Sequence, residues 1–204
     1  MALTNYSDLV ASVASWMNRT DLASVIPDFV TIAESKIARD LRLRTQLTSG
    51  TLTTSTTTRA VALPTGWLEF ESVTIDGTPD TLCTFRTTEY LDLVFPESGS
   101  SGKPIAYSIE GTNILFGPTP ASAYTVNIDY YARFGALASS STNWLLTNHP
   151  NVYLYACLRE GAFFTKDQAG AQQWDALYKQ EVKTLQASDD DQMHSGSALA
   201  VRTA

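Results

Sequence analysis

The chain has 204 residues, of which 44% are hydrophobic, and it carries a formal net charge of -7 with a pI of about 4.7. This length gives one domain, or a core domain with an inserted subdomain, and the apolar share is enough for a buried core. The acidic balance disfavours binding of nucleic acid through neutralised phosphates, and the lack of any run of about 18 apolar residues predicts no membrane span.

Residues of about 4–45 have the periodicity of helices. Ser7 and Asp8 can start a first helix, whose apolar residues lie three or four positions apart as far as Met17. The segment Asn18-Arg19-Thr20 then predicts a break. The opening residues lack a basic region followed by an apolar stretch, so we expect no secretory signal.

A second helix is predicted near Pro27, which suits a first helical turn because its missing N–H is not needed there. Its apolar stripe consists of Phe29, Ile32, Ala33, Ile37 and Leu41. We expect this helix to end in Arg42 and Arg44, since cations favour a helix C-terminus. Arg39, Arg42 and Arg44 have two interpretations. They form either a solvated face that complements the helix dipole, or a contact to a neighbouring subunit or a DNA channel.

Residues of about 46–135 have the composition of strands, and we expect a small antiparallel sheet inserted between helices. Turn signals at Pro64-Thr65-Gly66 and Asp76-Gly77 divide this segment. Thr51 to Thr58 is almost entirely Ser and Thr, which predicts an exposed strand or hairpin. The remaining predicted elements are a short helix from Glu89 to Phe95, a hairpin around Glu110 to Asn113, and an alternating strand from Tyr124 to Tyr130.

Residues of about 148–187 are helical again. A Ser-rich loop from Leu137 to Thr142 precedes them, and Pro150 marks a helix start. Asp167 can cap a last helix whose apolar stripe runs from Ala171 to Leu185.

From Ser188 onward the composition becomes polar and acidic, so residues 188–204 are predicted to be a flexible C-terminal tail. The expected fold class is α+β. The N- and C-terminal helices form a helical bundle, and a small antiparallel β-subdomain is inserted between them. Residues 1–187 together make one domain.

No arrangement of residues predicts a catalytic, cofactor-binding or metal site. His149 precedes a helix start and fits a packing or capping role, while His194 lies in the polar tail. Gly99 to Lys103 superficially resembles a phosphate-binding loop. However, Glu97 replaces its first Gly and Pro104 replaces its final Ser or Thr, so a surface loop is the better interpretation.

The remaining chemically distinctive residues also have structural interpretations. Asp189-Asp190-Asp191 lacks the spaced oxygens, Gly and distal Glu of a calcium loop. Cys83 and Cys157 are isolated, as in proteins of a reducing compartment. In an acidic chain, tryptophans favour core and interface packing over stacking on nucleobases; they are Trp16, Trp67, Trp144 and Trp174.

Several short motifs follow one another in a characteristic order. They are Tyr6 to Leu9, Trp16 to Leu22, Ile26 to Val30, Ala33-Glu34, Ile37 to Arg42, Leu63-Pro64, Gly102-Lys103-Pro104, Tyr107-Ser108, Tyr130-Tyr131, Asn143 to Leu146, Tyr153 to Tyr155, and Trp174 with Tyr178. Over residues 5–186 the chain thereby resembles the head-to-tail adaptor proteins of tailed bacteriophages, which are related to tail tubular protein A and the connector subunits of short-tailed phages. The order of the motifs carries the resemblance, because no single motif carries chemistry.

The resemblance implies a non-enzymatic subunit of a homo-oligomeric ring, usually of about twelve copies, below the portal protein. Such a ring extends the DNA channel and docks the tail tube or nozzle protein, and DNA passes through without specific binding. A C-terminal extension reaches the portal in related adaptors. The tail is therefore the candidate for that contact, and its candidate portal-contact residues are Leu199, Val201 and Arg202. The implied location is the head-to-tail junction of the virion, after synthesis in the host cytoplasm, with no membrane contact.

The sequence leaves three alternative functions open. One is another structural role in the virion, namely tail completion or capsid stabilisation. Another is a tail-associated cell-envelope hydrolase, which needs two carboxylates facing a cleft and has Glu69 and Glu71 as candidates. DNA binding is the third, and the acidic charge disfavours it.

Overall fold

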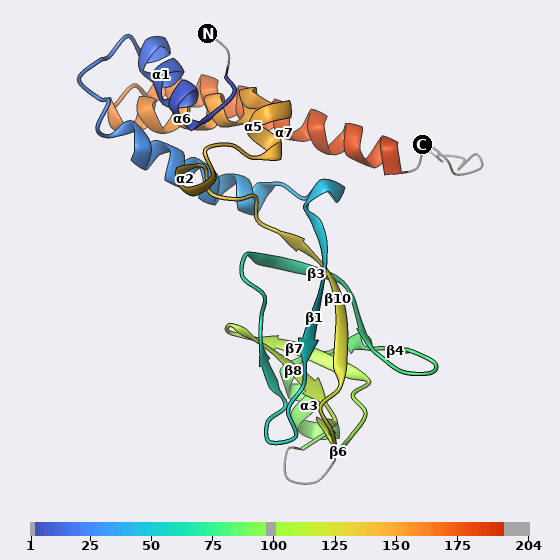
Figure 1. The fold of residues 1–204 in the computed structure, drawn as a ribbon. Helices are drawn as coiled ribbons and strands as arrows, with labels where there is room; N and C mark the ends of the chain where they lie inside the picture. Colours follow the sequence, from blue (N-terminus) through green and yellow to red (C-terminus); the bar gives the residue numbers. More distant parts are fainter. Residues whose placement is uncertain (1–2, 97–100, 194–204) are drawn as a thin grey trace. The chain divides into compact units, whose positions relative to one another are not determined.

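The computed structural model describes residues 3–96 and 101–193. Within these residues the chain forms two compact units (Figure 1). The helical unit comes from the described parts of Met1–Arg44 and Phe134–Ala204, and the β unit is Thr45–Arg133. Among the described residues the long helices all lie in one unit and the strands all lie in the other, so the predicted α+β fold class is confirmed. None of the described helices combines the length and the apolar character needed to cross a membrane.

The helical unit contains α1 (Tyr6–Met17), α2 (Ile26–Asp40), α4 (Leu137–Ser140), α5 (Trp144–Asn148), α6 (Pro150–Phe164) and α7 (Gln168–Met193). Its core is one apolar cluster to which α1, α2, α5, α6 and α7 all contribute. The largest fully buried side chains of this cluster include Tyr153, Tyr178, Ile37 and Leu41. Burial of these faces against one another supplies the main stabilisation of the bundle.

The start of α1 lies slightly before the predicted one. Asn5 is the N-cap, and its side-chain oxygen accepts the backbone N–H of Asp8 at 3.0 Å. The predicted break after Met17 is confirmed, because Asn18 adopts the left-handed conformation that ends the helix.

The apolar stripe of α2 is confirmed with one exception. Phe29, Ala33 and Ile37 are buried, and Pro27 occupies the first turn as predicted. Ile32, in contrast, is 48% exposed. It lies about 100° around the helix from Ala33, which turns it away from the core.

The prediction that α2 continues to Arg42 and Arg44 is wrong, because the helix ends at Asp40 and Leu41 is extended. Leu41 and Leu43 are both buried. Two residues that are two positions apart share a face only in extended backbone, so burial of both leucines favours ending the helix here. A short 3-10 helix, η1 (Arg44–Gln46), follows.

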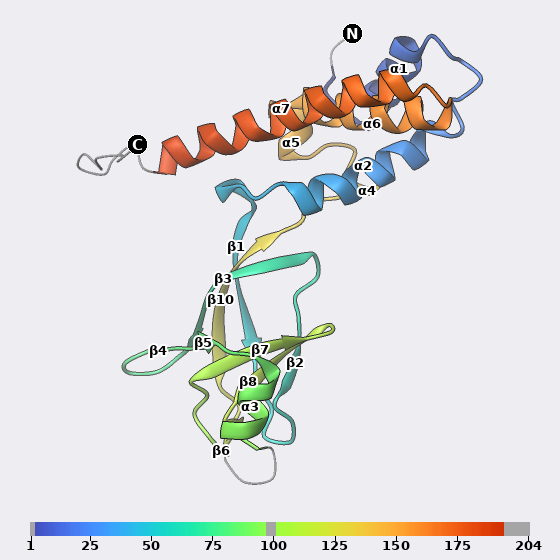
Figure 2. The same cartoon turned by 180° about the vertical axis from the view of Figure 1, so that it is seen from behind.

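The helices α6 and α7 form a hairpin around a short turn at Lys166. Asp167 accepts the backbone N–H of Gly170 at 3.0 Å, which confirms its predicted capping role. Since α6 has 15 residues and α7 has 26, the far part of α7 extends past the start of α6 (Figures 1 and 2).

The predicted Ser-rich loop at Leu137 to Thr142 is partly wrong, because α4 forms there. The buried Leu137 donates its N–H to Glu34 Oε1 at 2.7 Å, which fixes the start of α4.

The last helix was predicted to stop near residue 187, with a flexible tail after it. For residues 188–193 this prediction is wrong, because they continue α7. Residues 194–204 of the predicted tail lie outside the described residues.

The β unit is more complex than the single small antiparallel sheet predicted. Its first sheet has the order β1-β10-β3-β4, and its second has the order β2-β8-β7-β5. Two strand pairs, β5 with β7 and β6 with β9, are parallel. The elements are β1 (Leu47–Thr53), β2 (Ala60–Ala62), β3 (Trp67–Ile75), β4 (Thr81–Leu82), β5 (Thr84–Phe85), α3 (Thr88–Val94), β6 (Ser101–Gly102), β7 (Ala106–Glu110), β8 (Asn113–Gly117), β9 (Thr119–Pro120) and β10 (Thr125–Ala132).

Both four-stranded sheets of the β unit contribute to one apolar cluster. The alternation predicted for β10 is confirmed, since Val126, Ile128 and Tyr130 are all buried. They meet Phe116 and Ile114 of the second sheet. Alternate residues of a strand face the same side, so one face of each sheet closes this core. On the other face of the second sheet, Ala106 and Leu115 form a smaller apolar cluster with Leu91 of α3. The predicted short helix, capped by Thr87, and the hairpin of β7 and β8 are also confirmed.

Candidate assembly surfaces of the helical unit

Helices α2 and α7 run in the same direction (Figures 1 and 2) and meet through long side chains. Lys36 Nζ lies 5.0 Å from the centre of the Tyr178 ring, and the backbone oxygen of Asp40 accepts from Gln186 Nε2 at 3.0 Å. Farther along, Arg44 contacts Asp189. Residue numbers rise together on both sides of this contact, which fixes its parallel direction.

A buried polar group stands at the middle of the contact. The Tyr178 hydroxyl donates to Asp40 Oδ2 at 3.1 Å, and Lys36 Nζ reaches the same oxygen at 3.1 Å. Burial, together with the adjacent Asp40 carboxylate, raises the pKa of Tyr178 far above its ordinary value. The hydroxyl is therefore neutral at every physiological pH and acts as a permanent donor.

The three arginines predicted as interface or channel residues have different surroundings. Arg42 is partly buried and donates from Nη1 to the backbone oxygens of Ala38 and Leu41, each at 2.8 Å. It thus satisfies carbonyl groups at the end of α2. Arg44 binds within the helical unit, whereas Arg39 is exposed on the last turn of α2.

The last turns of α7 are held by Asp189. Its Oδ2 accepts the backbone N–H of Arg44 at 2.8 Å and its Oδ1 accepts Nε of the same residue at 3.1 Å. Arg44 also donates to Gln192. A carboxylate that binds a guanidinium and a backbone amide together makes strong, charge-assisted hydrogen bonds. These bonds, with Leu185 buried one turn earlier, explain why α7 continues through residues 188–193.

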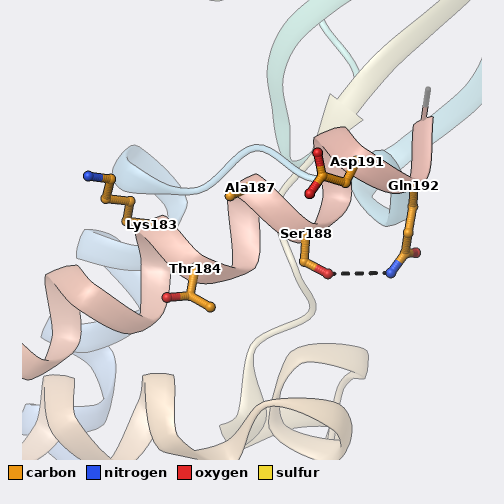
Figure 3. Close-up of a pocket in the computed structure, with 6 residues that line it drawn as sticks. All are labelled: Lys183, Thr184, Ala187, Ser188, Asp191 and Gln192. Carbon is orange, nitrogen blue, oxygen red and sulfur yellow. Dashed lines mark hydrogen bonds between the residues drawn. The ribbon is translucent and has the colours of Figure 1, made fainter. Parts of the chain in front are cut away.

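The opposite side of this part of α7 is exposed and hollowed (Figure 3). The hollow has a volume of about 570 Å³ and is lined by Lys183, Thr184, Ala187, Ser188, Asp191 and Gln192. Lys183, Ala187 and Asp191 recur at helical spacing on the side of α7 away from the buried Val182 and Leu185. Gln192 lies two turns after Leu185 and also binds Arg44. Sequence reasoning missed this surface. The signal it overlooked is the small side chains at 184, 187 and 188, between a cation and an acidic run.

A second exposed stripe follows the outer face of α2. It consists of Asp28, Ile32, Ser35 and Arg39, all exposed and all at helical spacing. An apolar side chain lies at its middle, with an acidic residue toward the N-terminus and a basic residue toward the C-terminus. Among the described residues, no ion pair involves Asp28, Arg39 or Lys183.

The bundle end at the α6–α7 turn carries an aromatic cluster. Trp16 meets Trp174 edge-on at 5.8 Å between ring centres, and Tyr155 stacks on Trp174 at 5.9 Å. A hollow of about 410 Å³ adjoins this cluster. The packing interpretation of these tryptophans therefore agrees with their contacts, although Trp16 is 56% exposed.

In the part of the chain that the structure describes, the side chains that could bind a metal or act as nucleophiles are scattered or buried. No cluster of three or more His, Cys, Asp or Glu side chains suited to a metal occurs there. His149 packs against the Trp144 ring at 5.4 Å. Burial raises the pKa of Cys83 to about 11 and raises that of Cys157 still further, so both thiols are poor nucleophiles.

The structure describes the candidate hydrolase carboxylates but not the candidate portal contacts. Glu69 and Glu71 both lie at exposed positions of β3. The pairing of β3 with β10 shifts register at Glu71, so strand alternation does not place the two carboxylates on opposite walls of a cleft. The portal-contact residues Leu199, Val201 and Arg202 lie outside the described residues.

Comparison with known proteins adds an observation that spans nearly the whole chain. No curated protein matches it. A family model, described as SU10 adaptor protein, matches residues 4–202. This range includes both units, the α2 and α7 surfaces and most of the segment after Met193. The chain therefore belongs to the SU10 adaptor protein family, an adaptor family of phage head-to-tail origin, and has the general role of a structural adaptor of a bacteriophage.

Proposed function

We propose that this chain forms a ring beneath the portal protein of a tailed bacteriophage, where it extends the DNA channel and docks the tail tube or nozzle protein. The family match over residues 4–202 is the observation that carries the proposal. The resemblance to head-to-tail adaptors implies about twelve copies, and heterologous contacts that close by rotation produce such a ring. The role is mechanical and non-enzymatic, and the chain acts as part of the virion.

The surfaces of the helical unit support assembly into a ring. A cyclic ring requires heterologous contacts, in which one surface of a subunit meets a different surface of its neighbour. The helical unit has two dissimilar exposed faces, on α2 and on α7. Arg39 belongs to the first of these and is our candidate for the subunit contact. Arg42 and Arg44 support the contact indirectly, since they fix the end of α2 and the end of α7.

The charge of the chain supports passive conduction of DNA. A net charge of -7 repels phosphate, so DNA moves through a channel of such subunits without being gripped. In this proposal acidic side chains face the lumen. Replacement of lumen carboxylates by lysines is expected to slow DNA ejection from assembled particles at low salt, because phosphate would then bind to the wall.

The C-terminal segment is the proposed contact to the portal. The helix α7 continues to Met193, and residues 194–204 follow it with Leu199, Val201 and Arg202 as the proposed anchors. A short apolar segment that folds when it binds its partner pays its ordering entropy at that moment, so removing its anchors weakens binding strongly. Truncation after Met193 is expected to abolish portal binding while leaving the fold of the free chain unchanged.

The proposal is tested by the mass of the complex with and without the portal protein of the same phage, measured by light scattering and native mass spectrometry. We expect a small species alone and a ring of about twelve copies on the portal. A chain that never binds the portal would refute the proposal and would favour tail completion or capsid stabilisation instead. The truncated chain serves as the negative control for the portal contact.

A further inference from the structure

We propose that the exposed face of α2 in one copy packs, nearly parallel, against the hollowed face of α7 in the next copy. This inference rests on the proposed function, because it names the contact that closes the ring. The occupant of the α7 hollow is thus a second copy of this chain. Two dissimilar faces on one unit make the contact heterologous, as a cyclic ring requires.

The two faces complement each other in charge when the helices run in the same direction. Asp28 near the start of the α2 face then lies beside Lys183 at the start of the α7 face. At the far ends, Arg39 approaches the acidic end of α7, which includes the exposed Asp191. An antiparallel arrangement reverses this pattern and places like charges together, which costs binding energy.

The apolar residues at the centre of the contact align in the same register as the charged residues. Ile32 lies four residues after Asp28, and Ala187 lies four residues after Lys183, so both are about 6 Å farther along their helices. Alignment of the charged pair therefore sets the Ile32 side chain beside Ala187. The small side chains at this point leave the hollow of about 570 Å³ open to it (Figure 3).

The far ends of the two faces differ slightly in length. Asp28 and Arg39 are about 16 Å apart along α2, and Lys183 and Asp191 are about 12 Å apart along α7. The difference of about 4 Å lies within the reach of the long Arg39 and Lys183 side chains.

The symmetry of a ring preserves the direction that this contact needs. Within one copy α2 and α7 already run parallel, as the contacts from Lys36 to Tyr178 and from Arg44 to Asp189 require. Neighbours in a ring of about twelve differ by a rotation of about 30°. Such a rotation changes the direction of any helix by no more than that angle, so α2 of one copy remains close to parallel to α7 of the next. Packed helices commonly cross at about 20°.

Cysteine cross-linking tests the contact directly. Ile32→Cys and Ala187→Cys lie at exposed positions, and the native Cys83 and Cys157 are buried, so mild oxidation acts only on the introduced thiols. On the portal, the double variant is expected to give a ladder of disulfide-linked multimers up to the size of the ring. Each single variant is expected to give none, and an equal mixture of the two single variants is expected to give dimers alone.

Charge exchange supplies an independent test. Asp28→Lys and Lys183→Glu are each expected to raise the concentration needed for ring formation on the portal at least about tenfold, since each juxtaposes like charges at every interface. The combined variant is expected to recover most of this loss. Lys166→Glu is the matched control for Lys183→Glu, because Lys166 is exposed in the same unit and lies outside both faces.

The outcomes separate the inference from the proposed function. If the wild-type chain forms no ring on the portal, the proposed function and the inference both fail. If the wild-type chain forms the ring, but the double cysteine variant gives no ladder and the charge variants assemble normally, the inference alone is wrong. Circular dichroism of each free variant establishes that its fold is intact.

Discussion

Two surface regions of this chain differ in what they offer to a partner, although both units expose large apolar side chains, among them Trp16 and Phe164 of the helical unit. On the helical unit, charged and small side chains line the exposed faces of α2 and α7, with Ile32 as an isolated apolar residue. On the β unit, large apolar side chains are exposed, and Leu93 of α3 is 84% exposed. In the same unit Phe85 is 57% exposed and Ile105 is 50% exposed.

This difference indicates two kinds of contact. Contacts through complementary charges specify direction and register, which suits repeated contacts between identical copies. Exposed apolar side chains instead suit a partner that covers them, since soluble proteins rarely leave such side chains in large contiguous groups. Both units have apolar interiors. The helical unit adds a buried hydroxyl that joins α7 to α2, and an ion pair from Arg44, just after α2, to Asp189 of α7.

We expect the largest effect on stability from a change in the apolar core of the β unit. Phe116→Ala removes a fully buried ring between the two sheets. We expect the free energy of unfolding to fall by about 3–5 kcal/mol, because apolar contact is lost and a cavity remains. Urea denaturation followed by amide hydrogen exchange in β8 and β10 measures this loss. A loss below about 1 kcal/mol would mean that the two sheets do not share a well-packed core.

The polar tie between α2 and α7 is tested by Tyr178→Phe. This change removes only the hydroxyl that donates to Asp40, and the expected loss is about 1–2 kcal/mol, since hydrogen bonds to charged groups exceed neutral ones. Tyr153→Phe is the matched control, because its hydroxyl accepts from the neutral Asn143 Nδ2 at 2.8 Å. We expect a smaller loss there. Equal losses in thermal denaturation would contradict the distinct role of the charged pair.

The end of α7 is tested by Arg44→Ala. We expect a loss of stability of about 1 kcal/mol or less, because the ion pair to Asp189 is partly exposed. The local effect is more informative. Amide hydrogen exchange in residues 186–193 should accelerate severalfold, while exchange in α6 stays unchanged. Unchanged protection at 186–193 would show that Arg44 does not hold this helix end.

A pH titration tests a polar cluster on the β unit. Hydrogen bonds from Ser49 and then Ser72 hold the pKa of Asp129 below its ordinary value of 3.8. Because the folded-state pKa is the lower one, the ionised carboxylate stabilises the fold above pH 3.8, and this contribution disappears as the pH falls through the folded-state pKa. Carboxyl NMR titration should show the pKa rising when Ser49 and Ser72 are both replaced by Ala. Asp129→Asn should remove this part of the acid sensitivity.

Much of the fold was predictable because its local signals agree with its packing. Pro27, Pro150 and Asp167 mark helix starts through local backbone chemistry, and the alternation of β10 reports directly on its buried face. The same holds for the hairpin of β7 and β8, whose turn lies between two apolar runs.

The errors lie where tertiary contacts override local preference. The end of α2 depends on burial of Leu41 and Leu43 in extended backbone, which the helical stripe of α2 conceals. The continuation of α7 past Ser188 depends on Asp189 meeting Arg44, a residue 145 positions earlier in the chain. The hollow on α7 was missed because its signal, small side chains between a cation and an acidic run, forms no apolar stripe.

A density map of this chain bound to the portal protein of its phage is the most direct test of the proposed ring. We expect a closed ring of about twelve copies on one face of the portal, with α2 of each copy packed nearly parallel on α7 of the next. A map that showed isolated copies on the portal, or a ring whose copies met through other surfaces with the α7 hollow open, would contradict it.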